Sequence, residues 1–230
     1  MNIEKINSRF RALTEWNLKH RLLTVLIFAA VFIVSVMGLK RIYFETSWDS
    51  YFREGDPMLE KTDDFKATFG NDYYVSVLVK NENGLFTKQN LELIRELSQN
   101  LMDSLSYSES ITSLTDLEFM IGTDGGMELG QIVPDTIPED AAGLEAIRER
   151  AYSKPELARR LISKDGTMSW IVVKLRPFPE DSVWKAEGNE SPDMLTGREA
   201  KQICMQEKYA SLNPSPSGMP FMSYEKMQYI

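Results

Sequence analysis

The sequence is poor in the residues that most often build reactive centres. Among its 230 residues there is one cysteine, Cys204, and one histidine, His20. A single cysteine cannot form an intramolecular disulfide, and a zinc site usually needs three or four Cys, His or carboxylate ligands. His20 also lies directly beside a long apolar run. We therefore expect neither a disulfide nor a Cys/His metal site.

Motifs of catalysis and of phosphate binding are missing as well. No histidine follows residue 20, and no G-x-S-x-G motif is present. The glycines within residues 122–130 match neither glycine-rich nucleotide motif, and the acids within residues 124–140 do not have the spacing of a calcium loop. The sequence thus predicts no enzyme and no cofactor, and it identifies no catalytic, cofactor-binding, metal-binding or substrate-binding residue.

Acidic residues outnumber basic residues outside the N-terminal segment. The net charge of the chain is −8, yet residues 1–41 carry seven basic and two acidic side chains, a net charge of +5. The remainder of the chain therefore carries −13. So acidic a region repels phosphate backbones and anionic lipid. We expect no nucleic-acid partner.

Charge is absent from Leu22–Leu39, which reads LLTVLIFAAVFIVSVMGL. As a helix, this run spans roughly 27 Å, close to the hydrocarbon thickness of about 30 Å. His20-Arg21 and Lys40-Arg41 bracket it, and such side chains can reach the interfaces. The run predicts a transmembrane helix at residues 22–39, with the lipid bilayer as its partner.

Two alternative interpretations of this run are a buried core helix and a cleaved signal peptide. A buried core helix would normally show a polar face, and Leu22–Leu39 has none. A cleaved signal peptide has a shorter apolar stretch and a small-residue cleavage site. Here the run is longer, and Val36-Met37-Gly38 is a poor site.

The Lys/Arg bias predicts the orientation of the helix. Five basic residues lie within residues 1–21, whereas Lys40 and Arg41 are soon followed by acids. This bias favours a cytoplasmic N-terminus in the cell (inner) membrane and an extracytoplasmic main domain. Residues 1–21, a cytoplasmic basic segment, have apolar residues at helical spacing. They predict either an amphipathic helix on the inner lipid surface or a short cap on the spanning helix.

Residues 40–72 form a membrane-proximal connector. Residues 42–57 are rich in aromatic residues, which often lie in the interfacial belt, and Leu59–Phe69 predicts a helix that Gly70 ends. Tyr73–Lys80 then predicts a central strand, because it is apolar on nearly both faces.

A βαβ unit follows from this strand. Thr87 can cap a helix whose apolar stripe runs from Leu91 to Leu105, and Ser110–Leu117 predicts the second strand. Such a unit favours parallel strands. An insertion comes next, with a glycine-rich loop at residues 122–130 and a helix that starts at Pro138.

The second half repeats the pattern. A capping box at Ser153–Glu156 predicts a short helix to about Leu161, and Thr167–Leu175 predicts a strand. A second capping box at Thr196–Glu199 predicts a helix to about Leu212, after which Ser211–Ser217 is expected to be a Pro/Ser linker. Met219–Tyr224 predicts the last strand.

These elements predict the fold class. One N-terminal transmembrane α-helix is followed by an α+β domain over residues 73–230, a ferredoxin-like split βαβ with a helical insertion and helices on one face of a four-stranded sheet.

Several stretches resemble the resistance-nodulation-division (RND) transporter superfamily, especially its MMPL-type exporters. The basic N-terminus and apolar run resemble that family's opening, and the similarity extends from about residue 10 to residue 230. Further similar stretches are Ile42–Trp48, Gly55–Pro57, Phe65, Phe69-Gly70, Gly84–Thr87, Pro155, Leu161–Gly166, and Gly218–Pro220 with Glu225.

The resemblance implies a first spanning helix and a first porter domain, truncated before a second spanning helix. It implies that the chain is the N-terminal portion of an exporter of hydrophobic or lipid-like substrates, with the remainder of a multi-helix transporter or a split partner as its partner. The family's proton-coupling carboxylates lie in later helices and have no counterpart here. The alternative is a single-pass anchored extracytoplasmic binding or scaffold domain.

Overall fold

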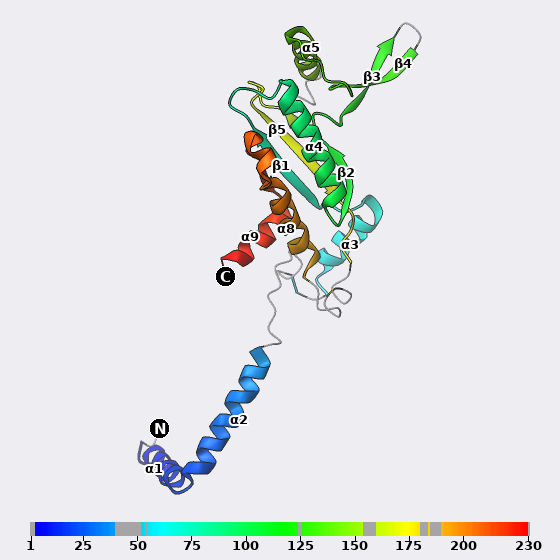
Figure 1. The fold of residues 1–230 in the computed structure, drawn as a ribbon. Coiled ribbons are helices and arrows are strands. Elements are labelled where there is room, and N and C mark those ends of the chain that lie inside the picture. The colour runs from blue at the N-terminus through cyan, green and yellow to red at the C-terminus, as the bar shows by residue number, and fades with distance from the viewer. Residues whose placement is uncertain are drawn as a thin grey trace. The chain divides into compact units, whose positions relative to one another are not determined.

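The fold is that of a computed structural model, which describes residues 3–39, 52–53, 55–123, 126–153, 160–179, 184 and 190–229. The chain divides into two compact units, Met1–Ser50 and Tyr51–Ile230 (Figure 1). Each unit is described by itself.

The first unit contains helices α1 (Ile3–Lys19) and α2 (Arg21–Leu39), which are separated at His20. The 19 residues of α2 have a mean hydropathy of 2.8, and none of them is buried. A core helix of a globular protein would be covered by other elements. In the described part of the chain, α2 is the one helix that is long and apolar enough to cross a membrane.

The second unit combines helices with antiparallel strands. In chain order its elements are α3 (Pro57–Phe69), β1 (Tyr74–Lys80), α4 (Lys88–Ser104), β2 (Ser108–Thr112), β3 (Glu118–Thr123), β4 (Gly126–Gln131), α5 (Ala141–Tyr152), β5 (Met168–Leu175), α8 (Pro192–Cys204), η2 (Glu207–Leu212), β6 (Ser215–Ser217) and α9 (Met219–Gln228).

Helix α3 agrees with the helix expected in the connector. The Asp56 side chain accepts a hydrogen bond from the Met58 N–H (2.9 Å) and so caps its first turn. Gly70 ends the helix with a φ of 85°, a conformation that glycine adopts without strain. The aromatic stretch at residues 42–51 and most of the helix expected at Ser153–Leu161 lie outside the described residues.

The main sheet has the strand order β2-β5-β1-β6, and every neighbouring pair is antiparallel. Val77 pairs with Ile171 on one side and with Pro216 on the other, so β1 is a central strand, as predicted. The expectation of parallel neighbours was wrong. Strand β5 lies between β1 and β2, so the two strands that α4 connects are not neighbours in the sheet.

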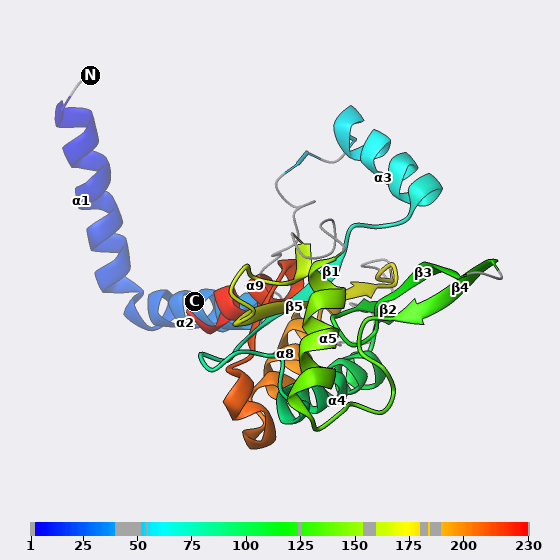
Figure 2. The ribbon, with the colours of Figure 1, turned by 90° about the horizontal axis from the view of Figure 1, so that it is seen from above.

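Helices α4 and α8 cover the same face of this sheet (Figures 1 and 2). Alternate residues of β1 and β5 point into one core with the apolar stripe of α4 and with α8. The fully buried members of that core include Val75, Val77, Val79, Ile94, Leu97, Leu101, Ile171, Val173, Leu175 and Ala200. The Thr87 cap on α4 is confirmed, since its side chain accepts from the Asn90 N–H (3.2 Å).

The insertion has its own small core. Ile132, Ile147 and Ala151 are buried together with Leu91 of α4. The glycine-rich stretch was expected to be a loop, but β3 and β4 form a hairpin that projects from the domain (Figure 1). Glycine has a low strand propensity, and the glycines in this stretch interrupt the alternation of apolar and polar side chains that would predict strands.

Two expectations at the C-terminal end were wrong. The expected linker contains the edge strand β6, and the expected last strand, Met219–Tyr224, lies in helix α9. Pro216 is tolerated in β6 because this strand lies at the sheet edge. Pro220, near the start of α9, has a fixed φ that suits a first helical turn.

Helix α8 begins at Pro192 rather than at Thr196. The Thr196 hydroxyl therefore donates back to the Pro192 carbonyl (2.7 Å) and caps nothing. One residue later, α8 meets α9. A Cβ atom on Gly197 would lie 2.2 Å from the Pro220 carbonyl oxygen, so the two helix backbones approach as closely as a glycine allows.

Candidate functional site

Two loops meet at one end of the main sheet. One is the β1–α4 connection, residues 81–87, and the other is the turn at residues 163–167 that leads into β5. The Leu85 N–H donates to the Gly166 carbonyl (2.9 Å), and the Asn81 N–H donates to the Thr167 carbonyl (2.9 Å). These backbone bonds fix one loop against the other.

Gly166 allows an aromatic ring to lie against the turn. Its φ is +74°, and a Cβ atom there would lie 3.3 Å from the Phe86 ring and 3.4 Å from the Tyr152 hydroxyl. Any larger side chain would push Phe86 away in addition to straining the backbone. The turn and the ring therefore form one surface.

Helix α5 supplies the opposite wall. Its first turn is capped by Asp140, whose side chain accepts from the Gly143 N–H (2.8 Å). The Arg95 guanidinium of α4 donates to the carbonyls of Pro134 (2.7 Å) and Asp135 (2.8 Å) and so fixes the segment before α5. At the other end of α5, the Tyr152 hydroxyl donates to the Ser163 carbonyl (2.6 Å).

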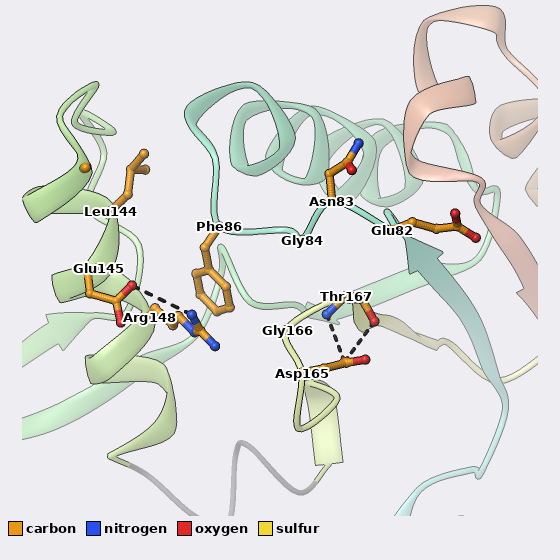
Figure 3. Close-up of a pocket in the computed structure, with 11 residues that line it drawn as sticks. Glu82, Asn83, Gly84, Phe86, Leu144, Glu145, Arg148, Asp165, Gly166 and Thr167 are labelled. Atoms are coloured by element: carbon orange, nitrogen blue, oxygen red, sulfur yellow. Dashed lines mark hydrogen bonds and ion pairs between the residues drawn. The ribbon is translucent and has the colours of Figure 1, made fainter.

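A cavity of about 410 Å³ lies between these segments. Figure 3 shows the Phe86 ring and the Arg148 side chain directed into the same space, with Asp165 below Gly166 and Glu82 on the side away from α5. The residues that line it are Glu82, Asn83, Gly84, Phe86, Ala141, Leu144, Glu145, Arg148, Asp165, Gly166 and Thr167.

The charged groups of this cavity differ in their partners. Glu145 lies 3.9 Å from Arg148, whose guanidinium also lies over the Tyr152 ring at 6.0 Å. Glu82 pairs with Lys80 at 3.4 Å. Asp165 is different, because within the described residues no Lys or Arg forms an ion pair with it.

Asp165 is held as a carboxylate by neutral donors. Its Oδ1 atom accepts from the Ser163 hydroxyl (2.5 Å), the Thr167 N–H (3.1 Å) and the Thr167 hydroxyl (2.8 Å). These bonds, that of Ser163 foremost, lower the pKa of Asp165 from 3.8 to about 2. Oδ2 takes part in none of the three bonds. Burial, in contrast, raises the pKa of the nearby Tyr152.

The Asp165 turn predicts a pH-dependent stability. Because the pKa is lower in the folded chain, ionised Asp165 stabilises the fold above its ordinary pKa, and this stabilisation is lost as the pH falls from about 4 to about 2. Asp165→Asn should therefore lower the thermal unfolding midpoint at pH 6. The difference in midpoint between this variant and the parent chain should disappear towards pH 2.

Thr167→Val provides the control, because it removes one of the two hydroxyl donors and keeps the backbone donor. In a chain that carries Thr167→Val, the difference in unfolding midpoint that Asp165→Asn causes at pH 6 should be smaller than in the parent chain. If Asp165→Asn lowers the unfolding midpoint by the same amount at pH 6 and at pH 2, these hydrogen bonds do not favour the ionised form of Asp165.

The described residues offer little for covalent or metal chemistry. No group of three or more His, Cys, Asp or Glu is placed to hold a metal ion in the part of the chain that the structure describes. Cys204 is buried in α8, and burial raises its pKa to about 12, so its reactive thiolate is scarce. That the chain is not an enzyme remains a prediction.

The sequence identified none of the cavity residues as a site. Their types are common, and the site arises only from the contact between loops that lie far apart in the sequence. A comparison of the chain with known protein families finds no family that matches, and a comparison with curated proteins finds no match either.

Proposed function

We propose that the chain is the N-terminal portion of an RND/MMPL-type membrane exporter that handles hydrophobic or lipid-like substrates. The observation that carries this proposal is α2, a helix of 19 residues with none of them buried and with no charged side chain after Arg21. Such a helix is stable in water only if something covers it, and a bilayer of about 30 Å matches its length. The basic flank supports the proposal that the N-terminus is cytoplasmic and the second unit extracytoplasmic, at the cell (inner) membrane.

The second unit then serves as a porter domain with the ferredoxin-like split βαβ arrangement. Two features support this assignment. The crossovers β1-α4-β2 and β5-α8-β6 interleave, since β5 pairs with both β1 and β2 while β1 pairs with both β5 and β6. Both crossover helices also pack on one face of the sheet. This arrangement agrees with the domain that the sequence resemblance implies between the first two spanning helices.

The alternative function is that of a single-pass anchored binding or scaffold domain. The cavity beside Asp165 favours it, because every wall of that cavity comes from the second unit itself. No further spanning helix is needed to complete it. The two functions differ in whether α2 acts as an anchor only or as one element of a transport path.

Reconstitution distinguishes the two functions. The purified chain, placed in liposomes with an imposed proton gradient, should give no gradient-dependent efflux of a lipophilic dye. One helix cannot screen a path through lipid, and α2 carries no ionisable group in its interior for proton coupling.

A multi-helix membrane protein that completes the exporter should restore the efflux when the two are reconstituted together. Efflux from this chain alone would overturn the proposal that it is a portion of a larger exporter. The anchored binding domain would be supported by two results together. The chain alone would bind a substrate stably, and adding a multi-helix membrane protein would produce no efflux.

A further inference from the structure

The cavity beside Asp165 has the size and the mixed lining of a small-ligand site. Its volume of about 410 Å³ lies within the range of about 300–1,000 Å³ that is typical of such sites. Phe86 and Leu144 give it an apolar part, and Asp165 and Thr167 give it a polar part. A ligand that fits must therefore offer both an apolar body and a polar group.

The charge of the polar group follows from the ion pairs. Arg148 and Lys80 are already matched with Glu145 and Glu82, so these four side chains leave no net charge. Asp165 remains as a carboxylate that is held by neutral donors only. The cavity thus has an excess of one negative charge, and that charge lies on the turn that supports Phe86.

A metal ion does not suit this arrangement. The carboxylates of Glu82, Glu145 and Asp165 come from three separate segments around the cavity (Figure 3), and they form no metal-binding group among the described residues. Aromatic and aliphatic walls also favour an organic body over a hydrated ion. A positive charge near the face of a phenyl ring gains further from the cation–π attraction.

We propose that this cavity binds a small organic cation, with its ammonium group at Asp165 and its apolar or aromatic body against Phe86 and Leu144. The proposal goes beyond the exporter function and does not depend on it, because every residue that it uses lies in the second unit. A chain that is only an anchored binding domain would bind the same class of ligand.

Three probes that share a phenylethyl body test the charge requirement. The full chain, in nanodiscs of zwitterionic lipid, is titrated with phenethylammonium, with neutral 2-phenylethanol and with anionic 3-phenylpropanoate, each up to roughly 10 mM. The amide resonances of Gly84 and Gly166 report on the cavity. Only the cation should shift them in a saturable way, and added salt should weaken its binding.

Variants of the chain test which residues bind the probe. Asp165→Asn should weaken phenethylammonium binding roughly fivefold, whereas Glu149→Gln, on the same helix as Arg148 but away from the cavity, should leave it unchanged. Arg148→Gln should tighten it, because the change removes a positive charge from the cavity. A gain in affinity cannot result from a loss of folding.

Three results would overturn the proposal. The first is the absence of a saturable shift with phenethylammonium. The second is equal binding of the cationic and neutral probes, which would indicate an apolar site without charge selectivity. The third is weakened binding in the Arg148→Gln variant, since that result would contradict the requirement for negative charge in the cavity.

Discussion

A chain that carries both Ala29→Arg and Ala30→Arg should fail to enter the membrane. A dozen Leu, Ile, Val and Phe side chains of α2 favour insertion by roughly 4–7 kcal/mol in total. One central arginine costs about 2.5–3.5 kcal/mol, which that sum can still offset. Two arginines cost about 5–7 kcal/mol and cancel it, so the double variant should leave the membrane fraction after a carbonate wash.

A fused reporter measures insertion and sidedness together. Alkaline phosphatase joined after Ile230 should be active in a bacterial host when the second unit lies outside the cytoplasm. This activity should persist with Ala30→Arg alone and be lost in the double variant. The control is Ala29→Leu with Ala30→Leu, which changes the same sites and should keep full activity. An inactive reporter on the parent chain would contradict the orientation that the charge bias predicts.

The variant Gly197→Ala should destabilise the second unit by roughly 2 kcal/mol. Alanine favours a helix over glycine by about 1 kcal/mol, so propensity alone would stabilise α8. The new methyl group, however, would lie 2.2 Å from the Pro220 carbonyl oxygen and 2.9 Å from the Tyr224 Cβ atom. Both neighbours belong to α9, and a backbone carbonyl cannot rotate away, so the two helices must separate.

Urea unfolding followed by tryptophan fluorescence measures this effect. Gln202→Ala, at an exposed position of the same helix, is the matched control and should change the unfolding midpoint little. Coincident unfolding curves for Gly197→Ala and the parent chain would mean that α8 and α9 do not cross at this residue.

The elements that the sequence predicted well are those with a complete apolar pattern. The strand at Tyr73–Lys80, the helix that Thr87 caps and the strand at Thr167–Leu175 all form within one residue of the expected start. Each buries a periodic row of side chains in one core. In these segments local propensity and long-range packing favour the same structure, and so pattern alone sufficed.

The elements that were predicted wrongly depend on tertiary contacts. Ser215–Ser217 has no apolar alternation, and it is a strand only because β1 offers an unpaired edge. The hairpin β3–β4 likewise contains glycines that lower its strand propensity. Thr196–Glu199 matches a capping box in sequence, yet Pro192 and Asp193 already start that helix.

The cavity beside Asp165 could not be predicted for a related reason. One of its two loops directly precedes the helix that Thr87 was expected to cap, and the other directly precedes the predicted strand at Thr167–Leu175. Their contact depends on the antiparallel pairing of Lys80 with Met168, which brings the end of β1 to the start of β5.

The interleaved strand order also governs when the sheet can form during synthesis. β1 is made early, but its partner β5 follows roughly 90 residues later and β6 roughly 140 residues later. Until then the valines of β1 have only α4 to pack against. The sheet is completed by the three residues of β6, so a short polar edge strand is the last strand to join the sheet.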